Sequence, residues 1–206
     1  MSLPAPSPSF EGSSNLLHTF ATITERIDLQ ILFPKQQPLE VELGCGDASF
    51  IVEYAKRHPK RNFLGVERLL GRIQKLDRKG RRAGLANLRG IRIENAYFLE
   101  WLLPHRSATA LHIYFPDPWP KKKHRRHRLV GDGFPALAER SLVPGGVVYL
   151  RTDDTDYFEQ MLMVFGAAKE FTAVETPTEL AEVRTDFEKD FNAKGIPTLR
   201  AGYQLR

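Results

Sequence analysis

The stretch that decides the fold is Leu39-Glu40-Val41-Glu42-Leu43-Gly44-Cys45-Gly46-Asp47-Ala48. It begins as a strand over Leu39–Leu43, passes through a glycine turn and opens a predicted helix over Ala48–Arg57. Glycines at such a turn let the backbone bend sharply and approach a ligand at the helix N-terminus. A strand that leads through a tight turn into a helix is typical of a βα unit in a parallel sheet.

The same alternation continues along the chain. Further strands are expected at Asn62–Val66, Leu88–Ile93, Ala108–Tyr114 and Val147–Leu150, and further helices at Leu69–Gly84, Ala96–Leu103, Gly133–Leu142 and Asp156–Lys169. Right-handed crossovers between parallel strands place helices on both faces of the sheet. Gly145-Gly146 is predicted to end a helix ahead of the next strand. Two later runs, Phe171–Thr176 and Thr198–Gln204, are expected to add an antiparallel edge. The sequence predicts a doubly wound, mostly parallel, Rossmann-like α/β sheet.

The 206 residues favour one domain, residues 37–206, after a flexible lead-in, residues 1–36, that could hold a short helix. No apolar run reaches the roughly 18 residues of a membrane-spanning helix. The single cysteine, Cys45, excludes an internal disulfide and fits a reducing cytoplasm. The net charge of +5 suggests an acidic partner, because the cations cluster at Lys56–Arg61, Arg78–Arg82 and Lys121–Arg128. We expect a monomer without a metal ion.

Two acidic residues flank the glycine turn in a pattern that suggests a cofactor. Glu42 precedes Gly44 by two residues, and Glu67 ends the second predicted strand. An acid at the end of that strand is placed to hydrogen-bond a ribose diol. Glu67 alone does not choose between cofactors, because dinucleotides use the same position.

Other features of the turn favour S-adenosylmethionine over a nicotinamide dinucleotide. The dinucleotide fingerprint has a third glycine where this chain has Ser49. Glu42 would crowd a phosphate, whereas a carboxylate suits the cationic end of a methionine moiety. A nicotinamide oxidoreductase is therefore the weakest alternative. Gly44 and Gly46 are predicted to form the cofactor turn.

The loop Phe115-Pro116-Asp117-Pro118-Trp119-Pro120 is expected to present a carboxylate and an aromatic ring just beyond a strand end. Each proline biases the residue before it toward extended backbone, so we expect Phe115, Asp117 and Trp119 to be held out of helix. Trp119 could stack on a base or anchor the loop. The next eight residues, Lys121–Arg128, contain six Lys/Arg and two His, which favour binding of a polyanion. His124 and His127 are expected to be solvated members of that cationic face.

These motifs together resemble the bacterial tRNA (guanine-N7-)-methyltransferases, which are S-adenosylmethionine-dependent. The resemblance is carried by Glu42–Gly46, Gly65-Val66-Glu67, Phe115–Lys122, Thr152-Asp153 and Thr185–Gly195, in order from about Pro38 to the C-terminus. The proline-flanked loop with its basic run, together with Thr185–Glu188, is the most specific part. The resemblance implies methyl transfer to N7 of a guanine in the variable loop of tRNA.

It also implies roles for individual residues. Asp117 matches the catalytic Asp, which lies beside the cofactor, and Asn95 stands where the family usually has an Asp that contacts adenine. The matched cofactor residues are Glu42 and Glu67, with Gly44 and Gly46 in the turn. The matched tRNA contacts are Lys121, Asp153, Thr185, Asp186, Phe187 and Glu188, and the RNA-interacting segment is Lys123, His124, Arg125, Arg126, His127 and Arg128. Asp186 stands at a variable position of its motif.

The chemistry fits this set of residues. Guanine N7 carries a lone pair, so the reaction requires alignment rather than deprotonation. Asp117 could accept hydrogen bonds from the base and stabilise its developing positive charge. An amino-group nucleobase methyltransferase is one alternative, but its loop has two prolines before the aromatic, whereas Asp117-Pro118-Trp119 has one. A non-catalytic RNA-binding module is another, and saturable binding of S-adenosylmethionine would argue against it.

Overall fold

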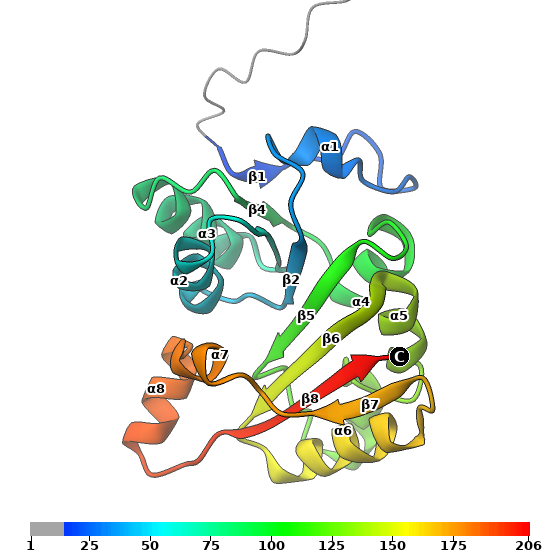
Figure 1. Ribbon diagram of the computed structural model, residues 1–206. Helices are drawn as coiled ribbons and strands as arrows, with labels where there is room; N and C mark the ends of the chain where they lie inside the picture. Colours follow the sequence, from blue (N-terminus) through cyan, green and yellow to red (C-terminus); the bar gives the residue numbers. More distant parts are fainter. Residues whose placement is uncertain (1–14) are drawn as a thin grey trace, which may run out of the picture.

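The computed structural model describes residues 15–206, which form an eight-stranded sheet covered by helices (Figure 1). The strand order is β1-β4-β3-β2-β5-β6-β8-β7. The strands are β1 (Leu17–His18), β2 (Leu39–Leu43), β3 (Asn62–Val66), β4 (Leu88–Ile91), β5 (Ala108–Tyr114), β6 (Leu142–Thr152), β7 (Phe171–Val174) and β8 (Leu199–Leu205). Neighbours from β1 through β6 pair in parallel, and β8 lies antiparallel to both β6 and β7. The predicted sheet and its antiparallel edge are confirmed.

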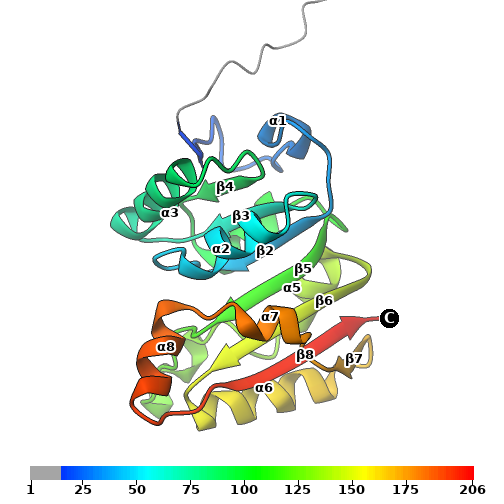
Figure 2. The ribbon, with the colours of Figure 1, turned by 60° about the vertical axis from the view of Figure 1, so that its left-hand side comes forward.

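Helices cover both faces of the sheet (Figure 2). The helical segments are α1 (Leu29–Leu32), α2 (Ser49–Arg57), α3 (Leu70–Arg82), α4 (Asn95–Tyr97), the π-helical turn η1 (Phe98–Leu102), the 3-10 turn η2 (Lys122–His127), α5 (Phe134–Ser141), α6 (Thr155–Ala167), α7 (Thr178–Glu182) and α8 (Asp186–Ala193). Side chains from α2, α3 and α7 pack in one buried cluster, and side chains from η1, α5 and α6 pack in the other. This two-sided covering is the doubly wound arrangement expected from the alternation.

The central strand β2 has apolar and acidic residues on opposite faces. Val41 and Leu43 belong to the buried cluster beneath α5 and α6. Glu40 points the other way, because its carboxylate contacts His112, whose ring lies 5.2 Å from that of Phe50 on α2. Side chains alternate along a strand, so Glu42 shares the face of Glu40. The sheet therefore holds a buried acid beside the glycine turn.

Two glycines have a different role from the predicted one. Helix α5 already ends at Ser141, and Gly145 and Gly146 lie within β6. The pairing of β5 with β6 shifts register there, from Ala108↔Leu142 to Ala110↔Val147, and Gly145 has φ +78°. Glycine accommodates such an irregularity because it has no Cβ. The pair therefore forms a strand irregularity and does not end the helix.

Residues 15–36 pack on the same sheet as the rest of the chain. Leu17 and His18 pair with Gly90 and Ile91, and the Leu16 N–H donates to Asp77 at 2.8 Å. This part of the chain also contains the buried side chains of Leu16, Ile27, Leu32 and Phe33. The first part of the expected lead-in, residues 1–14, lies outside the described residues. The expected boundary between the lead-in and the domain, at residues 36 and 37, remains a prediction. Residues 15–36 contribute side chains to the same hydrophobic core as the sheet.

Candidate active site

The candidate site lies where the carboxyl ends of the central parallel strands meet. Strand β2 lies between β3 and β5, which continue the sheet in opposite directions, so the glycine turn after it stands at the switch point of the sheet. Two adjoining clefts open there, of about 360 and 330 Å³, here called the Glu67 cleft and the Glu42 cleft. Both clefts are lined by Gly44, Arg72, Phe115, Pro116 and Asp117. The predicted turn and the predicted catalytic loop therefore form a common wall.

Glu67 holds the glycine turn in place at the first cleft. Its carboxylate accepts hydrogen bonds from the backbone N–H groups of Gly46 at 3.1 Å and Leu69 at 2.8 Å. The turn itself has left-handed backbone, with φ +75° at Gly44 and +55° at Gly46. A Cβ at Gly44 would stand 3.5 Å from the Asn95 side-chain amide, so this glycine keeps the cleft open.

Asn95 has a buried acceptor without a donor. Its Oδ1 receives no hydrogen bond from the described residues, and the residue lines the Glu67 cleft. A buried polar atom without a partner costs about 1–3 kcal/mol. This atom is therefore available to a ligand that supplies an N–H or O–H.

Glu42 is the most strongly perturbed acid of the site. The residue is 3% exposed, and its Oε2 receives no hydrogen bond from residues 15–206. Burial raises the pKa of Glu42 well above its ordinary range, and the positive charge of Arg151 opposes that rise only in part. A buried carboxyl group in this state favours a bound cation or N–H donor. The Glu42 cleft is thus suited to the positively charged part of a ligand.

Asp117 is an exposed carboxylate on the wall that the two clefts share, and it makes no hydrogen bond or ion pair with the described residues. Phe115, which precedes Pro116, and Trp119, which precedes Pro120, have φ values of +50° and +44°. Both residues lie outside any helix, as expected, but their backbone is left-handed rather than extended. Left-handed backbone at a residue with a Cβ costs roughly 1–3 kcal/mol, and such strain clusters at functional sites.

Packing explains why these two residues accept the strain. The Phe115 N–H donates to the Arg151 carbonyl at 2.8 Å, and the Phe115 ring lies 6.0 Å from that of Phe191. The Trp119 ring lies 5.3 Å from His127 and 5.9 Å from His124. The two histidines thus contact the loop, and Trp119 both packs on them and lines the Glu67 cleft. Stacking of Trp119 on a base remains a prediction.

The basic run divides into free cations and structural ones. Arg128 has a side chain that is 1% exposed and donates to the Pro118 carbonyl at 2.7 Å, to Gln160 at 2.7 Å and to Asp156 at 2.5 Å. Its guanidinium also lies 4.6 Å from the centre of the Tyr157 ring. The direct RNA contact of Arg128 stays a prediction, because the residue also lines the Glu67 cleft. In this structure its buried side chain joins the loop to α6.

The other members of the run are more accessible. Arg125 pairs with Asp156 at 2.7 Å and keeps part of its side chain in solvent. The exposed cations without an ion pair among the described residues are Lys121, Lys122, Lys123 and Arg126. Arg126 and His127 also line the Glu67 cleft. Four free positive charges therefore stand beside the cleft on turn η2 and the residue before it.

The Thr185–Glu188 motif also divides into cleft-lining and structural residues. Thr185 and Phe187 line the Glu42 cleft together with Asp153. The Thr185 hydroxyl caps α8 by accepting from the Glu188 N–H at 2.9 Å. Asp186 is held by two contacts, because its N–H donates to Ser49 at 3.0 Å and its carboxylate pairs with Lys189 at 2.9 Å. The motif thus borders the cleft and begins a helix.

Glu188 cannot contact a substrate directly in this structure. Its side chain is fully buried and pairs with Arg151 at 3.0 Å and with Arg200. The expectation that it contacts the substrate is therefore corrected, because both carboxylate oxygens are already bound by arginines. The acid instead holds α8 against strands β6 and β8.

Sequence reasoning missed Arg151, which supports this arrangement. The arginine is 1% exposed, donates to the Val183 carbonyl at 2.8 Å and lies 4.1 Å above the Tyr114 ring. Its position directly after the apolar run Val147–Leu150 could have predicted that Arg151 is buried. A buried arginine requires an acidic partner elsewhere in the chain. Arg72, which lines both clefts, was also missed because a single cation in a helix carries no distinctive pattern.

The fold and site define a class of protein. The site has a glycine turn at the switch point of a doubly wound sheet, an acid near the end of β2, an acid just after β3 and a buried acceptor after β4. This is the arrangement of an S-adenosylmethionine-dependent methyltransferase. The chain matches the family described as "Putative methyltransferase" over residues 36–201. It also resembles two curated proteins named tRNA (guanine-N(7)-)-methyltransferase. The chain therefore belongs to the tRNA (guanine-N(7)-)-methyltransferase family.

The first relative, from Halorhodospira halophila, is 35% identical over 87% of this chain and 80% of its own length. The second, from Chromohalobacter salexigens, is 38% identical over 69% of this chain and 58% of its own length. Among solved structures, the 16S rRNA methyltransferase KamB aligns with a TM-score of 0.62, covering 88% of this chain and 94% of its own. Its sequence is 16% identical, so that likeness concerns the fold. In residues 15–206, no helix is both long and apolar enough to span a membrane.

Proposed function

We propose that this protein transfers a methyl group from S-adenosylmethionine to N7 of a guanine in the variable loop of tRNA. The observation that carries the proposal is the common wall of the two clefts. Asp117 stands on that wall with a free carboxylate, between the cofactor acids and the residues at the start of α8. We further propose that the enzyme acts in the cytoplasm, because it has a single cysteine. We also propose that it is a monomer, because the exposed large hydrophobic side chains of residues 15–206 are spread over several elements.

The cofactor fits the unsatisfied groups of the site. We assign Glu67 to the ribose hydroxyls and Asn95 to the adenine, because Asn95 Oδ1 is a buried acceptor without a donor. We assign Glu42, with its free Oε2, to the cationic methionine end. Gly44 and Gly46 leave room for the ligand because neither carries a Cβ. Bound S-adenosylmethionine supplies an electrophilic methyl group on a sulfonium.

The side chains of the protein then position the substrate base and stabilise the charge that develops on it. Guanine N7 has an in-plane lone pair, so no side chain has to remove a proton before the attack. Asp117 accepts hydrogen bonds from the N–H edge of the base and stabilises the positive charge that methylation creates. Asp153, Thr185 and Phe187 line the same cleft and are assigned to the substrate base.

The tRNA backbone is assigned to the free cations of the basic run. Lys121, Lys123 and Arg126 are exposed and lack ion pairs with the described residues, so they can contact phosphates. His124 and His127 contribute through their contact with Trp119. Asp186 is assigned to the same RNA contact, and its N–H also donates to Ser49.

A methyl-transfer assay tests the proposal. Labelled S-adenosylmethionine is incubated with an unmodified tRNA transcript and with a matched transcript that carries 7-deazaguanine at the variable-loop position. Label on the first transcript alone supports transfer to N7. Label on both transcripts supports instead an amino-group or other base methyltransferase. Label on neither, with folded protein that binds the cofactor, contradicts the proposal and favours a non-catalytic RNA-binding module.

A further inference from the structure

Helix α3 carries a row of cations on one face. Arg72, Lys75, Lys79 and Arg82 are spaced by three, four and three residues, here called the α3 stripe. Residues at this spacing share one side of an α-helix, and the row covers about 15 Å along the axis. The neighbouring side of the helix packs on the sheet through Ile73, Leu76 and Gly80. The stripe therefore lies beside the buried face of α3, and Arg72, Lys75 and Arg82 are exposed to solvent.

Most of the stripe lacks a neutralising partner. Arg72, Lys75 and Arg82 are exposed and make no ion pair with residues 15–206. Like charges one turn apart destabilise a helix by a few tenths of a kcal/mol per pair. Elsewhere on α3, Arg81 pairs with Asp77 at 3.0 Å, whereas the exposed Arg78 makes no ion pair with the described residues. The unbalanced row favours an anionic partner outside the chain.

One member of the stripe is bound to the active site. Lys79 donates to Asp47 at 2.8 Å, and Asp47 belongs to the glycine turn that lines the Glu42 cleft. Burial alone would raise the pKa of Asp47, but hydrogen bonds from Lys79 and Ser49 lower it to about 2. Asp47 therefore remains a carboxylate and holds the last turn of α3 beside the glycine turn.

The stripe is continuous with the candidate site at both ends. Arg72 lines both clefts, and in the Glu67 cleft it shares the lining with Arg126 of the basic run. Lys79 and Arg82 line a groove of about 860 Å³ whose other side includes Arg184, which also lacks an ion pair among the described residues. Ser49 lines both this groove and the Glu42 cleft. Cationic side chains thus extend from the clefts along α3.

We propose that the α3 stripe and this groove bind the sugar–phosphate backbone of the tRNA beyond the target loop. The inference rests on the proposed function, because it continues the path of the same RNA substrate. The basic run and the stripe then contact phosphates on two sides of the clefts, so the RNA backbone is held on both sides of the target guanosine. Such contacts are independent of sequence and set the position of the RNA.

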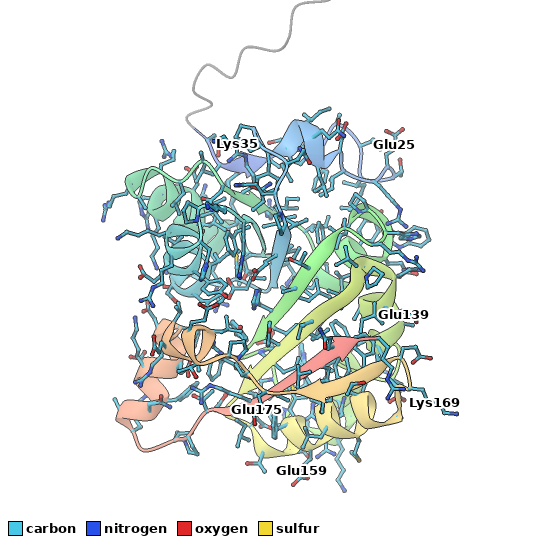
Figure 3. All side chains as sticks on the ribbon, viewed as in Figure 1. Glu25, Lys35, Glu139, Glu159, Lys169 and Glu175 are labelled. Carbon is cyan, nitrogen blue, oxygen red and sulfur yellow. The ribbon has the colours of Figure 1, made fainter. Side chains whose placement is uncertain are left out.

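A charge-neutralising double variant tests the stripe. Lys75→Ala with Arg82→Ala removes two exposed cations without touching the lining of the Glu42 and Glu67 clefts. The matched control is Arg140→Ala with Lys169→Ala, two exposed cations on α5 and just beyond α6 (Figure 3 labels Lys169, on the opposite side from α3). The salt dependence of binding is measured for full-length unmodified tRNA and for a short hairpin that carries only the target loop.

We expect a loss of tRNA affinity that occurs only when the stripe is changed and mainly with full-length tRNA. The slope of log K against log salt becomes shallower by about 1.4 to 1.8, and affinity at 0.1 M salt falls roughly tenfold. The affinity for the hairpin falls clearly less, and the control double variant leaves the salt slope for full-length tRNA unchanged. Affinity for S-adenosylmethionine, measured by calorimetry, serves as the test that the clefts remain intact.

Three results would overturn the inference: an unchanged slope, an equal loss with the hairpin, or an equal loss in the control pair. An unchanged slope in particular would mean that the stripe serves another anionic partner, such as an acidic protein segment, or only solvent. Failure of this inference can be distinguished from failure of the proposed function. Wild-type protein that fails to methylate N7 contradicts the function, whereas an unchanged slope with active wild-type protein contradicts the stripe alone.

Discussion

Glu188 and Arg151 form an ion pair of 3.0 Å in which neither side chain is more than 1% exposed. Arg151 stands at the end of β6, and Glu188 lies in the first turn of α8, so the pair joins the helix to the sheet. The charge of Arg151 also lowers the pKa of Glu42 against the larger effect of burial. One buried arginine therefore acts on both the cofactor acid and the helix that borders the substrate cleft.

Removal of Glu188 should destabilise the fold. Glu188→Ala leaves the buried Arg151 without its carboxylate, and breaking a buried pair from one side costs about 3–5 kcal/mol. Urea unfolding measures the change in the free energy of unfolding. Asp190→Ala, an exposed acid on the same helix, is the control and should stay within about 0.5 kcal/mol of the wild type. Equal midpoints for the two variants would show that the pair adds no stability.

Asp117→Ala should abolish most methyl transfer without unfolding the protein. The residue is exposed and makes no hydrogen bond or ion pair with the described residues, so its loss leaves no buried group unpaired. Loss of a group that stabilises transition-state charge lowers kcat by about 10²–10³-fold. Single-turnover assays measure the rate, and thermal melting checks the fold. Asp132→Ala, another exposed loop acid, should keep full activity; near-normal turnover of Asp117→Ala would refute the catalytic role.

Glu42→Gln should change the pH dependence of stability in the cofactor-free protein. Burial raises the Glu42 pKa, so the folded chain keeps this proton at pH values where the unfolded chain has lost it. Stability from this group is therefore present below the usual glutamate range and is lost as the pH rises through the raised pKa. Glutamine does not titrate, so the variant should show a flatter decline in Tm toward alkaline pH. Parallel Tm curves for the two proteins would contradict the raised pKa.

The same variant should bind the cofactor more weakly. A hydrogen bond to a charged group contributes about 1.5–3 kcal/mol, so the Kd for S-adenosylmethionine should rise roughly 10- to 150-fold. Calorimetry at one pH gives the comparison. Glu53→Gln, at an exposed position on α2, provides the control. Equal affinities for wild type and Glu42→Gln would show that Glu42 does not bind the cofactor.

The free and buried cations of the basic run should behave differently. Replacing Lys121, Lys122 and Lys123 by Ala removes three exposed charges and should make the salt slope of tRNA binding shallower by about 2 to 3. Arg128→Ala should instead lower the free energy of unfolding by roughly 1–3 kcal/mol, because its charged hydrogen bonds to Asp156 and Gln160 are lost. A stable Arg128→Ala variant with a reduced salt slope would show that Arg128 binds RNA and does not stabilise the fold.

Local patterns predicted the central sheet well. The bounds of β2, β3 and β5 agree with the expected ranges Leu39–Leu43, Asn62–Val66 and Ala108–Tyr114, because buried parallel strands are short apolar runs that end in turns. Strand β1 was missed because two residues carry no periodicity. Glu42 was found from its distance to Gly44, and Glu67 from its place at the end of the second predicted strand. Neither observation requires knowledge of tertiary contacts.

The remaining differences come from contacts between distant segments. Arg128 stands in a run of similar cations, and only the position of Asp156 on α6 determines that it is buried. Glu188 belongs to a motif with substrate-facing neighbours, and the arginines that bind it come from two separate strands. The left-handed backbone of Phe115 depends on its contacts with β6 and α8. No local pattern records such pairings.

The place of β8 constrains the order in which the chain can assemble. β8 lies between β6 and β7, and β7 pairs with β8 alone (Figure 1, red and orange arrows). During synthesis β7 therefore emerges with no neighbour to join, and it must wait until Leu199–Leu205 has been made. The same late strand delivers Arg200 to Glu188. A nascent chain can therefore form the ion pair between Arg200 and Glu188 of α8 only after Leu199–Leu205 has been made.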